Sequence, residues 1–199
     1  MSHTIWFFSD PHFAQESIIH FKRWDGQPMR PYRNAQEMDE ALIANCNERV
    51  KPQDHLYILG DISMKRWAIA KVGRINGHKR LITGNHDIHK TKDYLPFFEE
   101  IRGIRVFDNL LLTHIPVHPA SLPNVGTKKT WVNVHGHIHA NMSPEAYFTV
   151  YGPRYLNISC EMTDFFPIDL SELRRRIVVH QEAYTTWKEE NDVRETPAL

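Results

Sequence analysis

Five short strand-like runs in the chain are each followed by Asp, Asn or His. Apolar runs of this length are typical of buried strands. Polar residues at such strand ends can meet at one edge of a sheet, so the pattern predicts a metal site assembled from several strand tips. The runs and the residues after them are 4–8 with Asp10 and His12, 56–59 with Asp61, 80–83 with Asn85, His86 and Asp87, 110–113 with His114, and 131–134 with His135, His137 and His139.

Apolar positions spaced by three or four residues predict helices between the first strands. Asn34, with Glu37 three residues later, forms a start that resembles a capping box, and an apolar stripe follows until Pro52 ends the helix. A short helical turn is predicted over 16–21, and further helices are predicted over 65–75 and 93–100. The resulting β-α-β-α-β order predicts parallel pairing in at least part of the sheet.

The predicted elements of the second half lie closer together. Asp108 and Asn109 give a hairpin signal between two of these strands. The second half is therefore expected to contain more antiparallel pairing. Its further strands are predicted at 104–107, 147–151 and 155–159.

The chain of 199 residues is long enough for one domain with a substantial core, so residues 1–199 are predicted to form a single domain. Asp169 begins a last helix with Glu172 at the capping-box position. The tail over 191–199 is expected to fray.

The amino-acid composition of the chain limits the classes of function that are expected for it. Hydrophobic residues make up 41% of the chain and charged residues 24%, and the net charge is zero with His neutral. No field of the whole chain therefore attracts nucleic acid or an anionic membrane. Cys46 and Cys160 form no CxxC pair and are expected to be buried or half-buried thiols. No signal peptide or membrane span is expected, which predicts a cytoplasmic protein without a membrane partner.

The spacing of the polar residues suits a pair of divalent metal ions. Asp10 and His12 are two residues apart and can reach one ion from a tight turn, and His137 and His139 have the same spacing. Carboxylate, amide and imidazole ligands without thiolate suit Mn, Fe, Zn, Ni or Co. We expect two divalent ions, with Mn as the first choice because the resemblance described next favours it.

The series Asp10-x-His12, Gly60-Asp61, Gly84-Asn85-His86-Asp87, His114 and Gly136-His137-x-His139 resembles the calcineurin-like metallophosphoesterase superfamily. Within it, the chain is similar to small, cap-less members of bacterial and phage type that carry only the label of predicted phosphoesterases. The motifs span residues 10–139. The resemblance implies an α/β fold, a four-layer αββα sandwich of two mixed sheets flanked by helices.

The resemblance also implies roles for the residues of these motifs. A hydroxide bridging the metals would attack phosphorus in line. His135 is not used as a ligand in this pattern, and we expect it to be a core histidine. The first ion would be held by Asp10, His12 and His139, and the second by Asn85, His114 and His137. Asp61 would bridge the two ions. His86 would protonate the leaving oxygen or stabilise the charge, and Asp87 would orient His86.

Specificity would come from the loops over 13–33, 115–130 and 140–154, which leave the ends of ligand-bearing strands. The first loop is basic and aromatic, and Arg30 and Arg33 are predicted to bind substrate. The expected function is hydrolysis of nucleotide-type or small phosphodiesters at an open site, with nucleic acid as a possible substrate.

Other functions remain open at this stage. Within enzymes, the alternative is a phosphomonoesterase or a pyrophosphohydrolase. Outside them, the alternatives are a non-catalytic scaffold that uses the metal face to bind a partner, and a metal sensor. The sequence predicts neither the substrate nor the oligomeric state.

Overall fold

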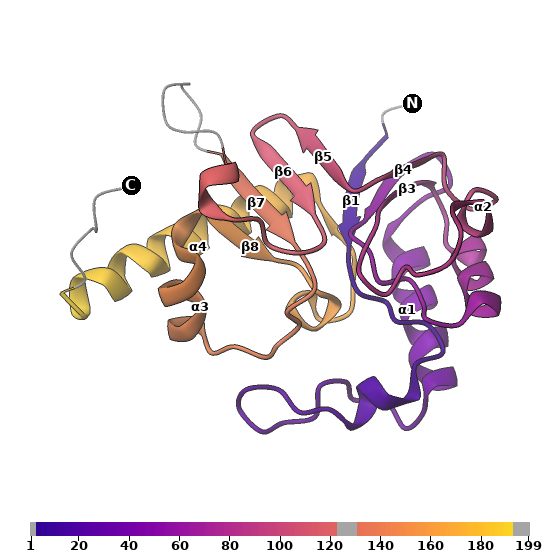
Figure 1. Cartoon of the computed structure of the whole chain (residues 1–199), viewed down its shortest axis with the longest axis horizontal. Coiled ribbons are helices and arrows are strands. Elements are labelled where there is room, and N and C mark those ends of the chain that lie inside the picture. The colour runs from indigo at the N-terminus through magenta and orange to yellow at the C-terminus, as the bar shows by residue number, and fades with distance from the viewer. Residues whose placement is uncertain (1–2, 123–130, 193–199) are drawn as a thin grey trace.

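Two mixed β-sheets form the centre of the molecule, and helices flank them (Figure 1). The computed structural model describes residues 3–122 and 131–192. The first sheet has the order β4-β3-β2-β1-β9 and the second the order β5-β6-β7-β8. The strands are β1 (Ile5–Phe8), β2 (His55–Ile58), β3 (His78–Ile82), β4 (Glu100–Arg102), β5 (Ile104–Phe107), β6 (Leu110–Thr113), β7 (Val132–His135), β8 (Tyr155–Asn157) and β9 (Ile168–Asp169).

Strand direction follows the length of the connections. β1, β2, β3 and β4 pair in parallel, as predicted for the first half, and β9 is antiparallel to β1. In the second sheet, β5 and β6 form the antiparallel hairpin predicted from Asp108 and Asn109, whereas β6, β7 and β8 pair in parallel. The expectation of more antiparallel pairing in the second half holds for β5 with β6 and for β9 with β1, while the other pairings of the second sheet are parallel. The connections over 114–131 and 136–154 are long enough to return the chain for a parallel pairing.

The helices include two long ones, α1 and α4, and each begins at its predicted capping residue. Asn34 accepts a hydrogen bond of 2.8 Å from the Glu37 amide, and Asp169 accepts one of the same length from the Glu172 amide. The helical elements are η1 (Glu16–His20), α1 (Ala35–Arg49), η2 (Arg66–Arg74), α2 (Thr91–Tyr94), η3 (Pro119–Ser121), α3 (Pro144–Tyr151), η4 (Gly152–Arg154), η5 (Cys160–Thr163) and α4 (Leu170–Glu190).

Three predicted elements differ from the structure. The strand predicted over 147–151 is the helix α3, because Ser143 caps its first turn and Pro144 fits its first position. The helix predicted over 65–75 is the 3-10 helix η2. The helix predicted over 93–100 is shortened to α2, and residue 100, the last of the predicted helix, belongs to β4. The tail over 193–199 lies outside the described residues.

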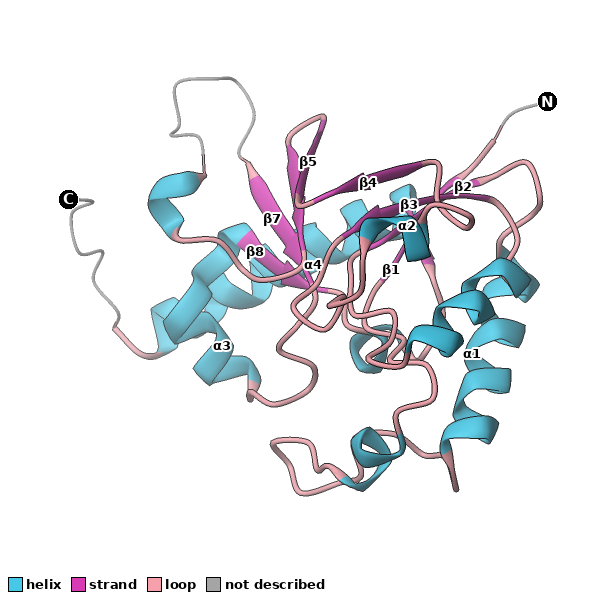
Figure 2. Ribbon diagram, turned by 45° about the vertical axis from the view of Figure 1, so that its right-hand side comes forward, coloured by secondary structure: helices cyan, strands magenta, loops and turns pink. Residues whose placement is uncertain are grey.

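Three hydrophobic clusters define the layers. Neighbouring residues of a strand point to opposite faces, so Phe8 packs with α1 and η2 while Phe7 packs between the two sheets. A third cluster packs Tyr147 of α3 against Leu111 and Tyr155 on the outer face of the second sheet. The order across the molecule is therefore helix, sheet, sheet, helix. Loops gather where the strands of the two sheets converge (Figure 2).

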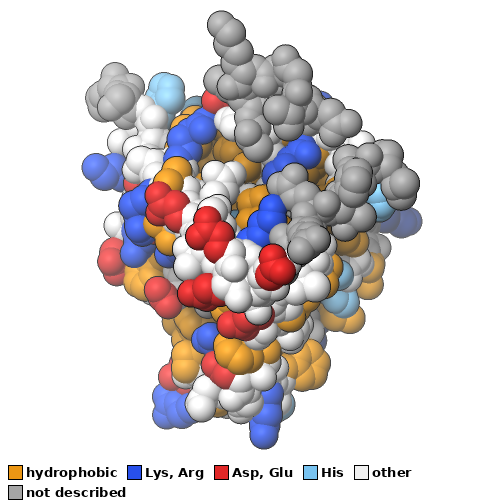
Figure 3. Space-filling view, turned by 90° about the vertical axis from the view of Figure 1, so that its left-hand side faces the viewer, with side chains coloured by type: hydrophobic (Ala, Val, Ile, Leu, Met, Phe, Trp, Pro, Cys, Tyr) orange, Lys and Arg blue, Asp and Glu red, His pale blue; other side chains and the backbone are white. Residues whose placement is uncertain are grey.

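The surface carries mixed charges on the face of α3 and α4. Acidic, basic and hydrophobic side chains lie side by side there (Figure 3). Cys46 and Cys160 are both buried free thiols, as predicted. Over residues 3–122 and 131–192, no helix combines the length and the apolar character needed to cross a bilayer.

Candidate metal centre

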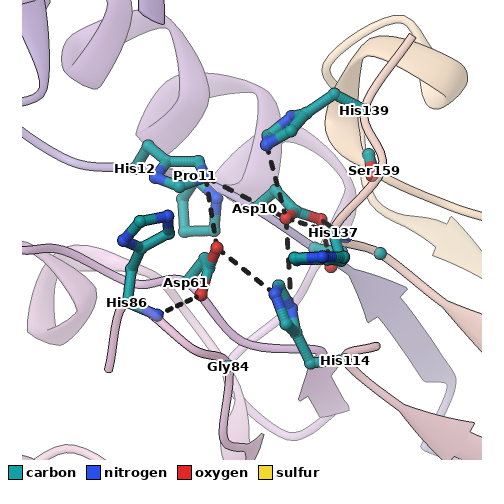
Figure 4. Close-up of polar contacts among 12 residues, drawn as sticks. Asp10, Pro11, His12, Asp61, Gly84, His86, His114, His137, His139 and Ser159 are labelled. Atoms are coloured by element: carbon teal, nitrogen blue, oxygen red, sulfur yellow. Dashed lines mark hydrogen bonds and ion pairs between the residues drawn. The ribbon is translucent and has the colours of Figure 1, made fainter. Parts of the chain in front are cut away.

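Six side chains from four strand ends converge into two adjacent groups (Figure 4). Asp10 and His12 follow β1, Asp61 follows β2, His114 follows β6, and His137 and His139 follow β7. Within each group, one ligand atom of every member lies within 4.8 Å of the others. The two groups that could hold a metal ion are Asp10 with His12 and His139, and Asp61 with His114 and His137.

Asp61 belongs to the second group and also lies close to the first. Its Oδ2 is 3.5 Å from His12 Nε2 and 3.3 Å from His114 Nε2. On the other side, Asp10 Oδ1 is 4.0 Å from His12 Nε2 and 3.8 Å from His139 Nε2. The carboxylates thus lie where each could share charge with two imidazole rings.

Three of the histidines share one orientation. His12 Nδ1 donates to Gln15 Oε1 at 2.9 Å, and His114 Nδ1 donates to the Leu59 carbonyl at 2.7 Å. His139 Nδ1 lies 3.1 Å from Glu161 Oε2. In each ring the second nitrogen, Nε2, therefore faces the carboxylates. Histidines that bind metals are held in this way, with the other ring nitrogen donating to an oxygen.

The surroundings of the His12 ring fit a bound metal ion. Its Nε2 is buried and has no hydrogen-bond partner among the described residues. Burial, with a smaller contribution from Arg30, lowers the pKa of His12 to about 3, so the ring is neutral and Nε2 offers a lone pair. A buried polar atom without a partner is costly, and a bound cation would satisfy it. The donor set of Asp and His fits divalent transition metals.

The other rings differ in protonation. Burial would lower the pKa of His114, but its hydrogen bond to Asp61 and the charges of Asp10 and Asp61 outweigh burial and raise the pKa to about 9. Burial also opposes the charge of His139, yet Glu161 raises its pKa. For His137, burial and the nearby His114 lower the pKa. The metal-free centre therefore holds at least one protonated ring.

Backbone strain is concentrated at this centre. Asp10, His12, Asp61, His137 and His139 all have positive φ angles, between 47° and 70°. Residues other than glycine adopt this left-handed region rarely and at a cost, and such strain clusters at functional sites. The turns after β1, β2 and β7 therefore hold these side chains in place against local conformational preference.

Two glycines allow the carboxylates to approach the backbone. A Cβ at Gly84 would lie 2.2 Å from Asp61 Oδ1, and one at Gly136 would lie 2.1 Å from Asp10 Oδ2. The carboxylates use this space to accept hydrogen bonds, since the His86 amide donates to Asp61 Oδ1 at 2.9 Å and the His137 amide to Asp10 Oδ1 at 3.0 Å.

Arg30 was predicted to bind substrate, and the structure corrects this. Its side chain is fully buried. Its Nε donates to Glu161 Oε1 at 2.7 Å, and its terminal nitrogens donate to the carbonyls of Asp10 and Pro11 at 2.6 and 2.8 Å. A guanidinium held by a carboxylate and two carbonyls has no free face for a substrate. Arg30 instead links the turn after β1 to η5.

Glu161 was missed by sequence reasoning. It follows the last motif by more than twenty residues and sits in η5, with its side chain fully buried. Burial would raise its pKa, but Arg30 and then His139 outweigh burial and hold the pKa far below its usual range. No residue spacing pointed to Glu161, because the contact forms only when η5 folds back on the strand ends.

The residues after β3 lie beside the two groups. Asn85 Oδ1 is 2.9 Å from His114 Nε2, next to the second group. The His86 ring packs 5.5 Å from the His12 ring, centroid to centroid. Both therefore lie near their predicted positions, while their roles stay predictions.

No hydrogen bond or ion pair joins Asp87 to the His86 ring in the described part of the chain, so Asp87 does not orient that ring directly, contrary to the prediction. Its carboxylate accepts hydrogen bonds from the amides of Asp61, Ile62 and Gly84 at 2.8–3.0 Å. Burial outweighs these bonds and raises the pKa of Asp87 to about 6. Asp87 ties the turn after β2 to the turn after β3.

The remaining candidates belong to neither group or lie outside the described residues. Arg33 is exposed and pairs with Glu37 at the start of α1. His135 is the buried core histidine that was expected, and its Nε2 lies 2.8 Å from the Tyr147 hydroxyl. Residues 123–130, which include part of one predicted specificity loop, are not described.

The two groups open into a cavity of about 170 Å³. His12, Asp61, His137 and His139 line it, and His86 lies on its wall. The arrangement can therefore present bound cations and an imidazole to one small anionic group.

Comparisons with known proteins give relatives of unknown function and one distantly similar nuclease. No family model matches the sequence. The chain is 31% identical over 171 residues to the uncharacterized protein MJ1445 of Methanocaldococcus jannaschii, covering 83% of this chain and 86% of the relative. The crystal structure of a protein of unknown function, AQ665 from Aquifex aeolicus, is similar with a TM-score of 0.63 and 25% identity, over 87% of this chain and 99% of that one. The crystal structure of Pseudomonas putida nuclease MPE has a TM-score of only 0.43 and 19% identity, over 68% of this chain and 61% of that one, which is too distant to carry an argument.

Proposed function

The chain belongs to the same family as MJ1445 of M. jannaschii, and we propose that it is a metal-dependent phosphoesterase of the calcineurin-like type that prefers phosphodiesters. The proposal assigns the two sheets and their flanking helices to the four-layer αββα sandwich of that superfamily, in a single domain. The observation that carries it is the shared orientation of His12, His114 and His139, whose Nε2 atoms face Asp10 and Asp61.

In this proposal, Asp10, His12 and His139 would hold a first ion, Asn85, His114 and His137 would hold a second, and Asp61 would contribute to both. Two divalent ions would supply positive charge to the phosphoryl oxygens and lower the pKa of water toward neutrality. Mn remains the metal of choice for assay, and Fe, Zn, Ni and Co suit the same donors.

The chain's own residues supply the rest of the chemistry. His86 lies on the wall of the same cavity, and its imidazole can donate a proton to the leaving oxygen. Asp87 fixes the backbone on which Asp61 and His86 sit, because it accepts hydrogen bonds from the amides of Asp61 and Gly84. A proton donor held beside the reacting phosphate needs this kind of rigid support.

The first test compares bis-(p-nitrophenyl) phosphate with p-nitrophenyl phosphate, using metal-stripped protein supplied with Mn²⁺. We expect turnover of the diester that depends on Mn²⁺, and a loss of at least 100-fold in Asp61→Asn, since one charged ligand is removed. Asp192→Asn makes the same chemical change at an exposed position and should match the wild type.

Other outcomes would change the assignment. Turnover of the monoester alone would make the protein a phosphatase. Two bound ions without turnover of either ester would contradict the proposal and favour a metal sensor or scaffold.

A further inference from the structure

A second cavity adjoins the candidate metal centre. Its volume is about 280 Å³, and it lies between the turn that carries Trp24, the start of α3 and one face of α4. His139 lines both this cavity and the one at the metal centre. The two cavities are therefore neighbours that share one wall residue.

The walls of this second cavity are rich in aromatic rings. Trp24, Tyr147, Phe148 and His180 all line it. Trp24 is 50% exposed and Met162, also on the wall, is 41% exposed. Large apolar side chains left open around a hollow favour an apolar or aromatic occupant.

The turn that carries Trp24 is held against the loop after His139. The Trp24 amide donates to the Ala140 carbonyl at 2.9 Å, and the Arg23 amide donates to the Gln27 carbonyl at 2.8 Å within the turn. Trp24 is therefore fixed beside the cavity by its backbone, although its ring is half exposed.

Most polar side-chain atoms on the wall of this cavity already form hydrogen bonds within the protein. Asn157 Nδ2 donates to the His139 carbonyl at 2.7 Å, and its Oδ1 accepts from the Ser159 amide at 3.0 Å. His180 Nε2 lies 3.2 Å from the Gly152 carbonyl, and the Tyr147 hydroxyl is engaged by His135. Arg23 differs, because its Nε is buried without a hydrogen-bond partner among the described residues, 3.7 Å from Asp25.

We propose that this cavity binds the base of a nucleoside phosphodiester whose phosphate lies at the metal centre. The inference rests on the proposed function and names its substrate class. All nucleobases are planar and can stack on aromatic rings. Because most polar atoms of the wall are already hydrogen-bonded, few remain to form base-specific hydrogen bonds. The cavity therefore accepts purines and pyrimidines alike, and Arg23 supplies a cation at its rim.

The test uses two esters with the same leaving group and the same Mn²⁺-loaded protein. These are thymidine 5′-(p-nitrophenyl phosphate) and methyl p-nitrophenyl phosphate, which differ only in the nucleoside. We expect a higher kcat/KM for the nucleoside ester. Trp24→Ala should reduce this preference about tenfold, because one stacking contact is lost.

Three variants sharpen the result. Trp24→Phe keeps a ring and should retain most of the preference, while Phe148→Ala should reduce it. Trp67→Ala removes a tryptophan that is 65% exposed on η2, away from this cavity, and should leave both esters unchanged.

The outcomes separate the two proposals. Turnover of the methyl ester with no preference for the nucleoside ester, or an equal loss on both esters in Trp24→Ala, would overturn the base-binding cavity and leave the phosphodiesterase intact. Turnover of neither ester would overturn the proposed function, and this inference with it.

Discussion

The carboxylate of Glu161 lies 3.1 Å from Nδ1 of His139, although Glu161 lies outside the sequence motif that contains His139. The same carboxylate accepts a 2.7 Å hydrogen bond from Arg30, whose other nitrogens hold the carbonyls of Asp10 and Pro11. One buried network therefore orients His139 and fixes the backbone of Asp10. Two members of the first candidate metal group depend on it.

Replacing Glu161 should weaken metal binding. Glu161→Gln removes the charge that holds the Nδ1 proton of His139 and leaves Arg30 without its anion. Loss of such a supporting partner costs about 10–100-fold in metal affinity. Titration calorimetry of Mn²⁺ into metal-stripped protein measures this, with Glu182→Gln on the exposed side of α4 as the control. Unchanged affinity in Glu161→Gln would mean that His139 does not bind a metal through this network.

Arg30 and Arg33 should respond differently to the same substitution. The side chain of Arg30 is 0% exposed and that of Arg33 is 86% exposed. Arg30→Met leaves the Glu161 charge buried without its guanidinium, and breaking a buried pair in this way costs about 3–5 kcal/mol of unfolding free energy. Arg33→Met should leave the urea midpoint unchanged. Equal midpoints for the two variants would contradict the buried network.

The contrast between these arginines explains part of what the sequence could predict. Both lie in a segment broken by Pro and Gly, which is typical of surface loops, and nothing local distinguishes them. Arg30 is buried because it pairs with Glu161, and this partner lies 131 residues away in the chain. Long-range partners of this kind leave no periodic signal. The strand ends, by contrast, are marked by local apolar runs, so the convergence of Asp10, Asp61 and His114 was predictable.

The same distinction applies to the fold. The start of α1 at Asn34 is a local capping signal and was predicted from the sequence alone. The start of α3 at Ser143 and Pro144 is equally local, and only the high β-propensity of residues 147–151 concealed it. The parallel pairing of β7 with β8 is different, because it depends on where a long connection returns.

A methyl group at Gly136 should disturb the first metal group. A Cβ there would lie 2.1 Å from both Asp10 Oδ2 and Ser9 Oγ, so the Asp10 carboxylate must move. We expect Gly136→Ala to lower Mn²⁺ affinity at least tenfold, comparable to the loss of a supporting contact. Gly103→Ala is a matched control, since a Cβ at Gly103 meets nothing within 4 Å. Wild-type affinity in Gly136→Ala would show that Asp10 can bind metal from another position.

Metal binding should release protons. The pKa of His114 is raised to about 9 because Asp61 and Asp10 outweigh the effect of its burial, so the ring is protonated at pH 7 in the metal-free protein. A metal ion at Nε2 must displace that proton, whereas His12, with a pKa lowered by burial to about 3, has none to lose.

Affinity should therefore fall as the pH falls below 9, by about tenfold per pH unit for one displaced proton. Calorimetric titration of Mn²⁺ at pH 7 in two buffers of different ionisation heat measures the protons released. We expect close to one from His114 and a further share from His139, whose pKa is also raised because Glu161 outweighs the effect of its burial. His114→Ala should release fewer protons than the wild type. Equal release by the two proteins would contradict the assignment of His114 as a ligand of the second ion.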